Sequence, residues 1–314
     1  MKKVLYLSHA TPEVYSIIRA TMPAEFELVT LDLNSDDERC HRIAECEVVI
    51  VAATPLRKPV IDAAKQLELV HHQGVGWQDT TDHEELKARG ITLALTPEGT
   101  TVGVAEHTVL LILAALKLLP FADSELRQGR FHVNALRPIS RELSGLTVGY
   151  IGMGRIAQAV AQRLGAFGTQ GIFFDPIVST AEGLQRRSID QVLQQADVIT
   201  LHLPLTPDTH HLIGADEIAQ MKRGAYLVNT ARGGLVDEAA LVGALESGHL
   251  AAAALDVFET EPLPAGHPLT RLNNVVLTPH ISAGTRDALQ TKMRALFSNV
   301  QRFYRDEPLQ NRVF

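Results

Sequence analysis

Short apolar runs and amphipathic segments alternate regularly along the first hundred residues of the chain. Runs rich in Val, Ile and Leu predict buried strands, and segments with apolar residues at helical spacing predict helices. The expected strands are Val4–Leu7, Glu27–Leu31, Val48–Val51, Leu67–Val70 and Ile91–Leu95. The expected helices are Pro12–Met22, Asp36–Cys46, Pro59–Gln66 and Asp82–Arg89. Such alternation predicts a parallel α/β sheet.

A second alternating region follows a break at Pro97-Glu98-Gly99. A long apolar helix is expected from Thr100 to Leu119. The later strands are expected at Gly171–Asp175, Val198–Leu201, Ala225–Val228, Ala251–Leu255 and Val275–Leu277. The last helix, Thr285–Tyr304, lies too far along to cover this second sheet. Its natural partner is the N-terminal sheet, so the pattern predicts a discontinuous first domain.

Residues Thr147–Leu164 carry a G-x-G-x-x-A pattern between a predicted strand and a predicted helix. Gly152 permits a tight turn, Gly154 lets a pyrophosphate approach the backbone, and Ala157 permits close helix–strand packing. The N–H groups at the helix start would receive the phosphates. In this strand–turn–helix context the pattern predicts a dinucleotide-binding Rossmann unit.

An acidic residue ends the strand that follows this fingerprint. Asp175 stands at the distance expected for a carboxylate that binds the adenosine ribose. The next residues, Pro176-Ile177-Val178, contain no arginine that would receive a 2′-phosphate. We therefore expect the chain to prefer NAD(H) over NADP(H).

Reactive side chains follow three strands in the second half of the chain. Arg232 comes after Ala225–Val228, Glu259 and Glu261 after Ala251–Leu255, and His280 after Val275–Leu277. Ligands of open parallel sheets bind beyond the carboxyl ends of the strands. A histidine paired with a carboxylate supplies an acid for a developing alkoxide, and an arginine holds a carboxylate substrate. Taken singly, each residue is compatible with a structural role, and the residues alone leave the choice of glutamate open.

Composition excludes several other classes of protein. The chain has 314 residues, 46% of them hydrophobic and 21% charged, which is ordinary for a globular protein with two cores. The net charge of −7 gives no footprint for nucleic acid. Thirteen histidines show no metal-binding spacing with acids or thiols.

The same features predict a cytoplasmic protein. Cys40 and Cys46 are the only cysteines, which is typical of a reducing compartment. The apolar run after Met1 is too short for a signal peptide, and the run Val109–Leu119 is interrupted by Lys117 and too short to span a bilayer. We expect no membrane partner.

With these motifs in place, the chain resembles the D-isomer-specific 2-hydroxyacid dehydrogenases over nearly its whole length. The segments that carry the resemblance are Gly74–Asp82, Thr96–Thr108, Gly149–Ala157, Leu201–Ile213, Asn229–Leu241, Leu255–Pro264 and Leu277–Thr285. The resemblance implies an α/β chain of two domains, with a NAD-binding Rossmann domain (98–285) inserted in a discontinuous flavodoxin-like substrate domain (1–97 plus 286–314). It also implies a homodimer.

The resemblance implies a role for each candidate catalytic residue. Arg232 would bind and polarise a 2-oxo acid, and His280 would be the general acid in reduction and the base in oxidation. Glu261, the acid just before Pro262, would orient His280 and favour its protonated form. The backbone N–H groups around Val75 and Gly76 would hold the substrate carboxylate.

The resemblance also implies the cofactor site. Asp175 would take the ribose hydroxyls, Asp256 would meet the nicotinamide carboxamide, Arg155 and Ile156 would cover the pyrophosphate, and Leu203 and Pro204 would border the adenosine. The complete set expected to contact NAD is Gly152, Gly154, Arg155, Ile156, Asp175, Leu203, Pro204, Thr230, Ala231, Arg232, Asp256, His280 and Ala283.

Departures from the family pattern bear on the substrate. Relatives that bind phosphorylated substrates carry arginines after the strand that corresponds to Val48–Val51. Here Ala52-Ala53-Thr54 follows, and Arg57 lies beyond the expected place. We therefore expect a small unphosphorylated 2-oxo acid such as glyoxylate, hydroxypyruvate or pyruvate.

Other functions are compatible with the same resemblance. One is a binding protein that senses NAD(H) and scaffolds other proteins, as some corepressor relatives do. Another is an enzyme of the phosphoglycerate dehydrogenase type. A formate- or phosphite-type dehydrogenase is disfavoured, because formate enzymes carry Gln where Glu261 stands.

Overall fold

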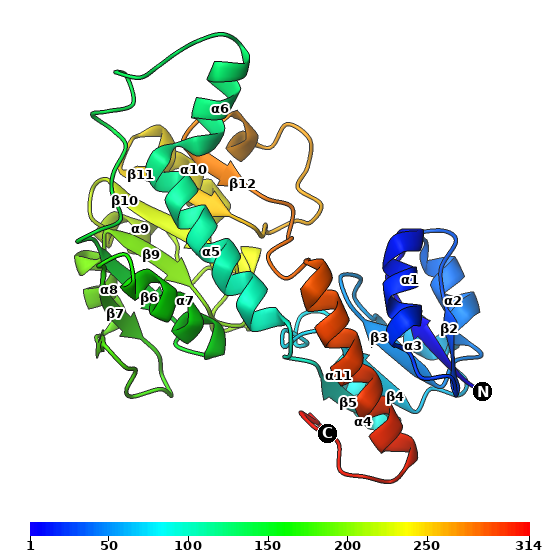
Figure 1. The fold of residues 1–314 in the computed structure, drawn as a ribbon. Coiled ribbons are helices and arrows are strands. Elements are labelled where there is room, and N and C mark those ends of the chain that lie inside the picture. The colour runs from blue at the N-terminus through cyan, green and yellow to red at the C-terminus, as the bar shows by residue number, and fades with distance from the viewer. The chain divides into compact units, whose positions relative to one another are not determined.

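The computed structural model describes residues 1–314, which form two compact units (Figure 1). The first unit comprises Met1–Thr100 and Gly284–Phe314, and the second comprises Thr101–Ala283. The second unit thus interrupts the first along the chain. The divisions lie three residues beyond position 97 and two before position 286, the expected limits.

The first unit contains a five-stranded parallel sheet with the order β2-β1-β3-β4-β5. This is the flavodoxin-like order. The strands are β1 (Lys2–Tyr6), β2 (Phe26–Val29), β3 (Val48–Val51), β4 (Leu69–His72) and β5 (Thr92–Leu95). The helices are α1 (Pro12–Thr21), α2 (Asp36–Ile43), α3 (Lys58–Ala63), α4 (His83–Ala88) and α11 (Arg286–Tyr304).

Helices cover both faces of this sheet. Ile43 of α2, Ile61 of α3 and Leu86 of α4 are buried in one core, on one face. On the other face, Ile18 of α1 packs in a common core with Phe297 of α11. The last helix therefore belongs to the first unit, because its apolar face completes a core that the first hundred residues leave open.

The second unit contains a seven-stranded parallel sheet with the order β12-β11-β10-β9-β6-β7-β8. This is a Rossmann order extended by one strand, and the direction of winding reverses between β6 and β9. The strands are β6 (Thr147–Ile151), β7 (Gln170–Phe174), β8 (Leu184–Arg186), β9 (Val198–Leu201), β10 (Ala225–Asn229), β11 (Leu250–Leu255) and β12 (Val275–Leu277). The hydrophobic pattern did not predict β8, since this short edge strand is largely polar and exposed.

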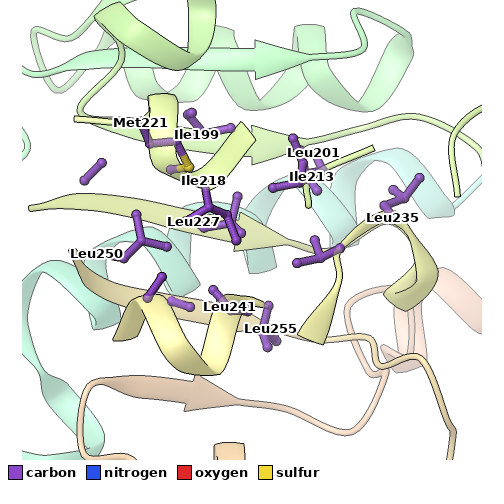
Figure 2. Packing of buried hydrophobic residues seen from close by; sticks show 14 of the residues in the cluster. Ile199, Leu201, Ile213, Ile218, Met221, Leu227, Leu235, Leu241, Leu250 and Leu255 are labelled. Atoms are coloured by element: carbon purple, nitrogen blue, oxygen red, sulfur yellow. The ribbon is translucent and has the colours of Figure 1, made fainter. Parts of the chain in front are cut away.

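The helices of the second unit are α5 (Thr100–Lys117), α6 (Leu119–Arg127), α7 (Arg155–Gly165), α8 (Ile189–Gln195), α9 (Ala215–Gln220) and α10 (Glu238–Glu246), with short 3₁₀ turns at Gly233–Leu235 and Pro268–Arg271. Helices α5 and α7 share one core with the sheet. On the opposite face, Leu227 of β10 and Leu255 of β11 pack with Ile218 of α9 and Leu241 of α10 (Figure 2). Both faces of the central strands are thus buried, as parallel sheets require.

Helix α5 is long and apolar enough to cross a bilayer by length and composition alone, and it is the one helix that meets this test. Core helices pass the same test, and 56% of its apolar window is buried within the protein. Leu111, Ile112 and Leu116 of α5 are each about 1% exposed, in the core shared with α7.

Candidate active site

The dinucleotide fingerprint forms the turn between β6 and α7. Gly152 has a φ of 90°, and a Cβ at this position would lie 2.4 Å from the carbonyl oxygen of His202. Only glycine fits there. Gly154 is the N-cap of α7, and a Cβ there would meet nothing within 4 Å. The open side of Gly154, next to the free N–H groups of the helix start, gives the room that a dinucleotide pyrophosphate needs.

Asp175 follows β7 and braces this turn. Its carboxylate accepts a 2.7 Å hydrogen bond from the Met153 N–H and 2.8 Å bonds from the N–H groups of Ile177 and Val178. Partial burial opposes ionisation, but these N–H donors hold the pKa of the carboxyl below its ordinary value. An ionised carboxylate therefore lies beside the glycine turn, as a ribose-binding acid would.

The structure also brings an arginine to Asp175 that the adjacent sequence lacks. Arg186 of β8 donates a 2.9 Å hydrogen bond from Nη2 to the Asp175 carbonyl oxygen. No arginine follows Asp175 as far as Val178, and the hydrophobic pattern does not predict the short strand β8 that carries Arg186. The pairing of β7 with β8 was the missing signal.

Arg232 lies in a tightly built loop after β10. Asn229 donates through Nδ2 to the Arg232 carbonyl oxygen at 2.8 Å and accepts from the Ala231 N–H at 3.0 Å. The next residue, Gly233, faces Phe258 so closely that a Cβ would lie 1.8 Å from the Phe258 carbonyl carbon. The loop after β10 and the loop after β11 therefore touch backbone to backbone.

His280 is paired with Glu261. The His280 Nδ1 and the Glu261 Oε2 are 2.8 Å apart, and Glu261 Oε1 accepts a 3.0 Å bond from the Phe258 N–H. Burial raises the pKa of the Glu261 carboxyl, but the hydrogen bond and charge of His280, the Phe258 N–H and the charge of Arg232 outweigh it and leave that pKa below its ordinary value. Glu259 instead lies beside His211, with 3.1 Å between its Oε1 and the His211 Nε2.

Asp256 organises the loop that carries His280. It is fully buried and accepts a 2.6 Å bond from the Thr278 hydroxyl and 2.9 Å bonds from the N–H groups of Ile281 and Ser282. The His280 N–H donates to the Asp256 carbonyl oxygen at 2.7 Å. Through these bonds the buried Asp256 fixes the loop after β12 that carries His280.

Sequence reasoning missed His107, which supports the same loop. This α5 residue has its Nε2 3.0 Å from the Thr278 hydroxyl oxygen and 3.4 Å from Asp256 Oδ1. The signal available was a histidine within a mainly apolar helix, which by itself is common in buried structure.

The remaining candidate cofactor residues of the second unit lie after strand ends and at the start of α7. Leu203 and Pro204 follow β9, and Arg155 and Ile156 open α7. Thr230 is buried with its hydroxyl 2.9 Å from that of Thr108. The other candidates in this unit are Ala231, beside Arg232, and Ala283, the last residue of the unit. No group of three His, Cys, Asp or Glu side chains is placed to hold a metal ion.

Val75 and Gly76 belong to the first unit, in the loop after β4. Thr80 braces this loop: its hydroxyl donates to the Gly76 carbonyl oxygen at 3.0 Å and lies 2.9 Å from Nε2 of the buried His72. Val75 is 42% exposed. Thr80 and His72 therefore hold the loop on its buried side, while Val75 is exposed to solvent.

Known proteins share these features. Residues 109–282 match the profile of the NAD binding domain of D-isomer specific 2-hydroxyacid dehydrogenases. A D-3-phosphoglycerate dehydrogenase of Methanocaldococcus jannaschii is 40% identical over 283 residues, 88% of this chain and 53% of that protein. A glyoxylate reductase of Thermofilum pendens is 42% identical over 238 residues, 74% of this chain and 70% of that protein. The chain thus spans about half the length of the phosphoglycerate dehydrogenases it matches.

Solved structures of similar chains share this fold over nearly their whole length. The TT0316 protein of Thermus thermophilus has a TM-score of 0.89 and 34% identity, covering 99% of this chain and all of that one. A NAD-dependent formate dehydrogenase of Staphylococcus aureus, solved with NAD, has a TM-score of 0.88 and 30% identity, covering 99% of this chain and 98% of that one. With its NAD-binding domain, its strand order and its full-length structural likeness, this chain belongs to the D-isomer specific 2-hydroxyacid dehydrogenase family.

Proposed function

We propose that this chain interconverts a small 2-oxo acid and its D-2-hydroxy acid with NAD(H). The observation that carries the proposal is the 2.8 Å contact between His280 and Glu261, beside the loop that carries Arg232. This arrangement joins a proton donor to a fixed cation at the carboxyl ends of Rossmann strands. It is the combination that reduction of a charged carbonyl compound requires.

Each member of the trio has a distinct task in this proposal. Arg232 binds the substrate carboxylate and polarises the 2-oxo group. His280 donates a proton from Nε2 to the carbonyl oxygen in reduction and accepts it in oxidation, while Glu261 holds Nδ1 and so fixes the ring. The N–H groups of Val75 and Gly76 bind the substrate carboxylate. Bound NADH supplies the hydride.

The cofactor site follows from the same reasoning. Gly152, Gly154, Arg155 and Ile156 take the pyrophosphate, and Asp175 takes the ribose hydroxyls. Leu203 and Pro204 border the adenosine. Thr230, Ala231, Asp256 and Ala283 line the nicotinamide end, where Asp256 accepts from the carboxamide.

An unphosphorylated substrate is favoured by the contacts of Arg57. Its Nη1 lies 3.1 Å from Asp82 Oδ1, and its Nη2 donates to the Asp79 carbonyl oxygen at 2.9 Å. A phosphate dianion normally requires dedicated arginine or lysine contacts. Because Arg57 is engaged within its own unit and Ala52-Ala53-Thr54 offers no cation, we propose glyoxylate, hydroxypyruvate or pyruvate.

A substrate panel tests the function directly. The purified protein is mixed with NADH and each of glyoxylate, hydroxypyruvate, pyruvate and 3-phosphohydroxypyruvate while nicotinamide absorbance is followed. We expect oxidation of NADH with at least one unphosphorylated acid. No turnover with any acid contradicts the enzymatic proposal, and a higher kcat/KM for 3-phosphohydroxypyruvate than for hydroxypyruvate contradicts the substrate class.

We also propose that the protein is a cytoplasmic homodimer associated through its second unit. Several large apolar side chains of α5, α6 and the following segment are at least half exposed, and an exposed apolar set is typical of an interface. They are Val102, Leu110, Leu119, Leu126, Phe131 and Val133.

A further inference from the structure

Two glutamates outside the trio join the loops that carry Arg232 and Glu261. The Glu238 N–H donates to Glu259 Oε1 at 3.0 Å, and the Glu259 N–H donates to Glu238 Oε1 at 2.8 Å. Each residue thus gives its backbone donor to the side chain of the other. Hydrogen bonds to an ionised acceptor are about twice as strong as neutral ones.

Glu238 is not needed to cap the helix it begins. The N-cap of α10 is Asp237, whose carboxylate already accepts a 3.0 Å bond from the Ala240 N–H. Glu238 is only 8% exposed. Burying a carboxylate is costly unless it is hydrogen-bonded, so its position depends on the donors it meets across the two loops.

An imidazole flanks each of these carboxylates. His267 Nε2 is 3.2 Å from Glu238 Oε2, and since His267 Nδ1 accepts from the Leu269 N–H at 3.4 Å, a neutral ring donates through Nε2. His211 Nε2 lies 3.1 Å from Glu259 Oε1. Burial and the charge of Glu259 raise the pKa of the Glu238 carboxyl, although the Glu259 N–H opposes this rise.

The loop after β10 and the loop after β11 are in close backbone contact beside the two glutamates. Gly233 packs directly on the backbone of Phe258, where even a Cβ would lie 1.8 Å from the Phe258 carbonyl carbon. Arg232 precedes Gly233, and Phe258 donates its N–H to Glu261 at 3.0 Å. Any change in the spacing of the loops therefore moves Arg232 relative to Glu261 and His280.

We propose that Glu238 and Glu259 form a reciprocal clamp that positions Arg232 against the Glu261–His280 pair. The inference rests on the proposed function, because it assigns the clamp a purpose in that reaction. Neither glutamate touches substrate or cofactor in this proposal; both act as positioning residues. Misplacement of a reacting group by about 1 Å costs up to about 100-fold in rate.

Four variants and one control test the clamp in the full chain. They are Glu238→Ala, Glu259→Ala, the double alanine variant, Glu238→Gln and, as control, Glu246→Ala at the exposed opposite end of α10. For the preferred 2-oxo acid we expect each single alanine variant to lose about 10-fold to 100-fold in kcat/KM. The double variant should lose no more than the worse single one, since the two bonds act as one unit. Glu238→Gln keeps an acceptor oxygen and should recover part of the loss.

The division of the effect between KM and kcat separates positioning from simple loss of folded protein. Displacement of Arg232 should raise KM and lower kcat together, whereas a smaller folded fraction lowers the apparent kcat alone. The Kd of NADH should stay within about twofold of the wild type, and Glu246→Ala should match the wild type throughout. Unchanged kinetics in the single variants, additive losses in the double variant, or a loss in kcat alone would overturn the clamp.

Hydrogen exchange keeps this inference apart from the proposed function. In Glu238→Ala, peptides that contain the Glu259 N–H should exchange faster than in the wild type, with no change at β6. If the wild type reduces none of the acids, the proposed function fails and the positioning role fails with it, while faster exchange still establishes the bond. Unchanged exchange contradicts the clamp in either case.

Discussion

At the scale of single residues, His280 is held in a backbone conformation that few non-glycine residues adopt. Its φ is 51°, in the left-handed region. Such strain persists only where the surroundings over-determine it, and it gathers at functional sites. Here Asp256 takes the His280 N–H with its carbonyl oxygen and two later N–H groups with its carboxylate, while Glu261 takes Nδ1.

Removal of the imidazole tests its role as the acid. His280→Ala should lower kcat by about 10²–10⁴-fold, the usual cost of losing a general acid. The Kd of NADH, measured by fluorescence titration, should change little because the phosphate and ribose contacts lie elsewhere. Near-native turnover in a variant with an unchanged circular dichroism spectrum is incompatible with the proposed mechanism.

The partner carboxylate predicts a pH dependence of stability. The pKa of Glu261 in the folded chain lies below the ordinary value of 4.5. A lowered pKa stabilises the fold above the ordinary value, and that stabilisation disappears as the pH falls through the folded pKa. The Tm difference between wild type and Glu261→Gln should therefore be largest near neutral pH and shrink below pH 4.5. A difference that grows on acidification contradicts this sign.

At the scale of elements, the two glycines of the turn from β6 to α7 meet different requirements, one of the fold and one of the cofactor. Gly152 satisfies the fold, because its φ of 90° and the His202 carbonyl at 2.4 Å exclude any side chain. Gly154 has open space where its Cβ would stand, so the protein itself does not require glycine there.

A matched pair of alanine variants tests this division. Gly152→Ala should destabilise the second unit by more than about 1 kcal/mol, since it adds both backbone strain and a clash. Gly154→Ala should unfold like the wild type but bind NADH at least about tenfold more weakly, because its methyl group occupies the pyrophosphate path. Denaturant unfolding measures the stability, and NADH titration measures the affinity. If Gly154→Ala binds NADH as tightly as the wild type, the assigned phosphate site is wrong.

The pairing of β7 with β8 bears on the choice of cofactor. Asp175 should make kcat/KM higher for NADH than for NADPH, because its charge repels a 2′-phosphate. Asp175→Ser should bring the kcat/KM for NADPH closer to that for NADH, because the repelling charge is gone and Arg186 supplies a nearby cation. Equal kcat/KM values for the two cofactors in the wild type would contradict the role of Asp175.

At the scale of the whole molecule, the chain builds two parallel sheets, and each is covered on both faces by its own helices. The first sheet obtains part of its cover from α11, nearly two hundred residues after β5. The second unit leaves apolar side chains of α5 and α6 exposed. An unpartnered apolar set of this kind favours association.

Light scattering tests the proposed dimer. At micromolar concentration we expect twice the chain mass of 34.3 kDa. Phe131→Asp and Leu126→Asp together should shift the population toward the monomer, because they place charge in the proposed interface. A wild-type mass equal to that of one chain contradicts the proposal.

The sequence by itself determined the features that depend on local pattern. The strands Val48–Val51, Val198–Leu201 and Val275–Leu277 have the predicted bounds, because each is a short, mainly apolar run that begins directly after a polar residue. Most other predicted ends differ by one or two residues, as at β4, since helix and strand termini depend on caps and pairing. The glycine fingerprint and the acid at Asp175 were also recognisable, because the two glycines share one turn and the acid directly follows the strand that comes after helix α7.

Only the tertiary structure decided which distant groups meet. It brought Arg186 to Asp175 through an edge strand too short and polar to predict, and it placed His107 beneath the Asp256 loop. It paired His280 with Glu261 and His211 with Glu259, a choice that two glutamates two positions apart left open. The physical reason is that such contacts depend on strand order and loop path, which a linear pattern of polar and apolar residues does not encode.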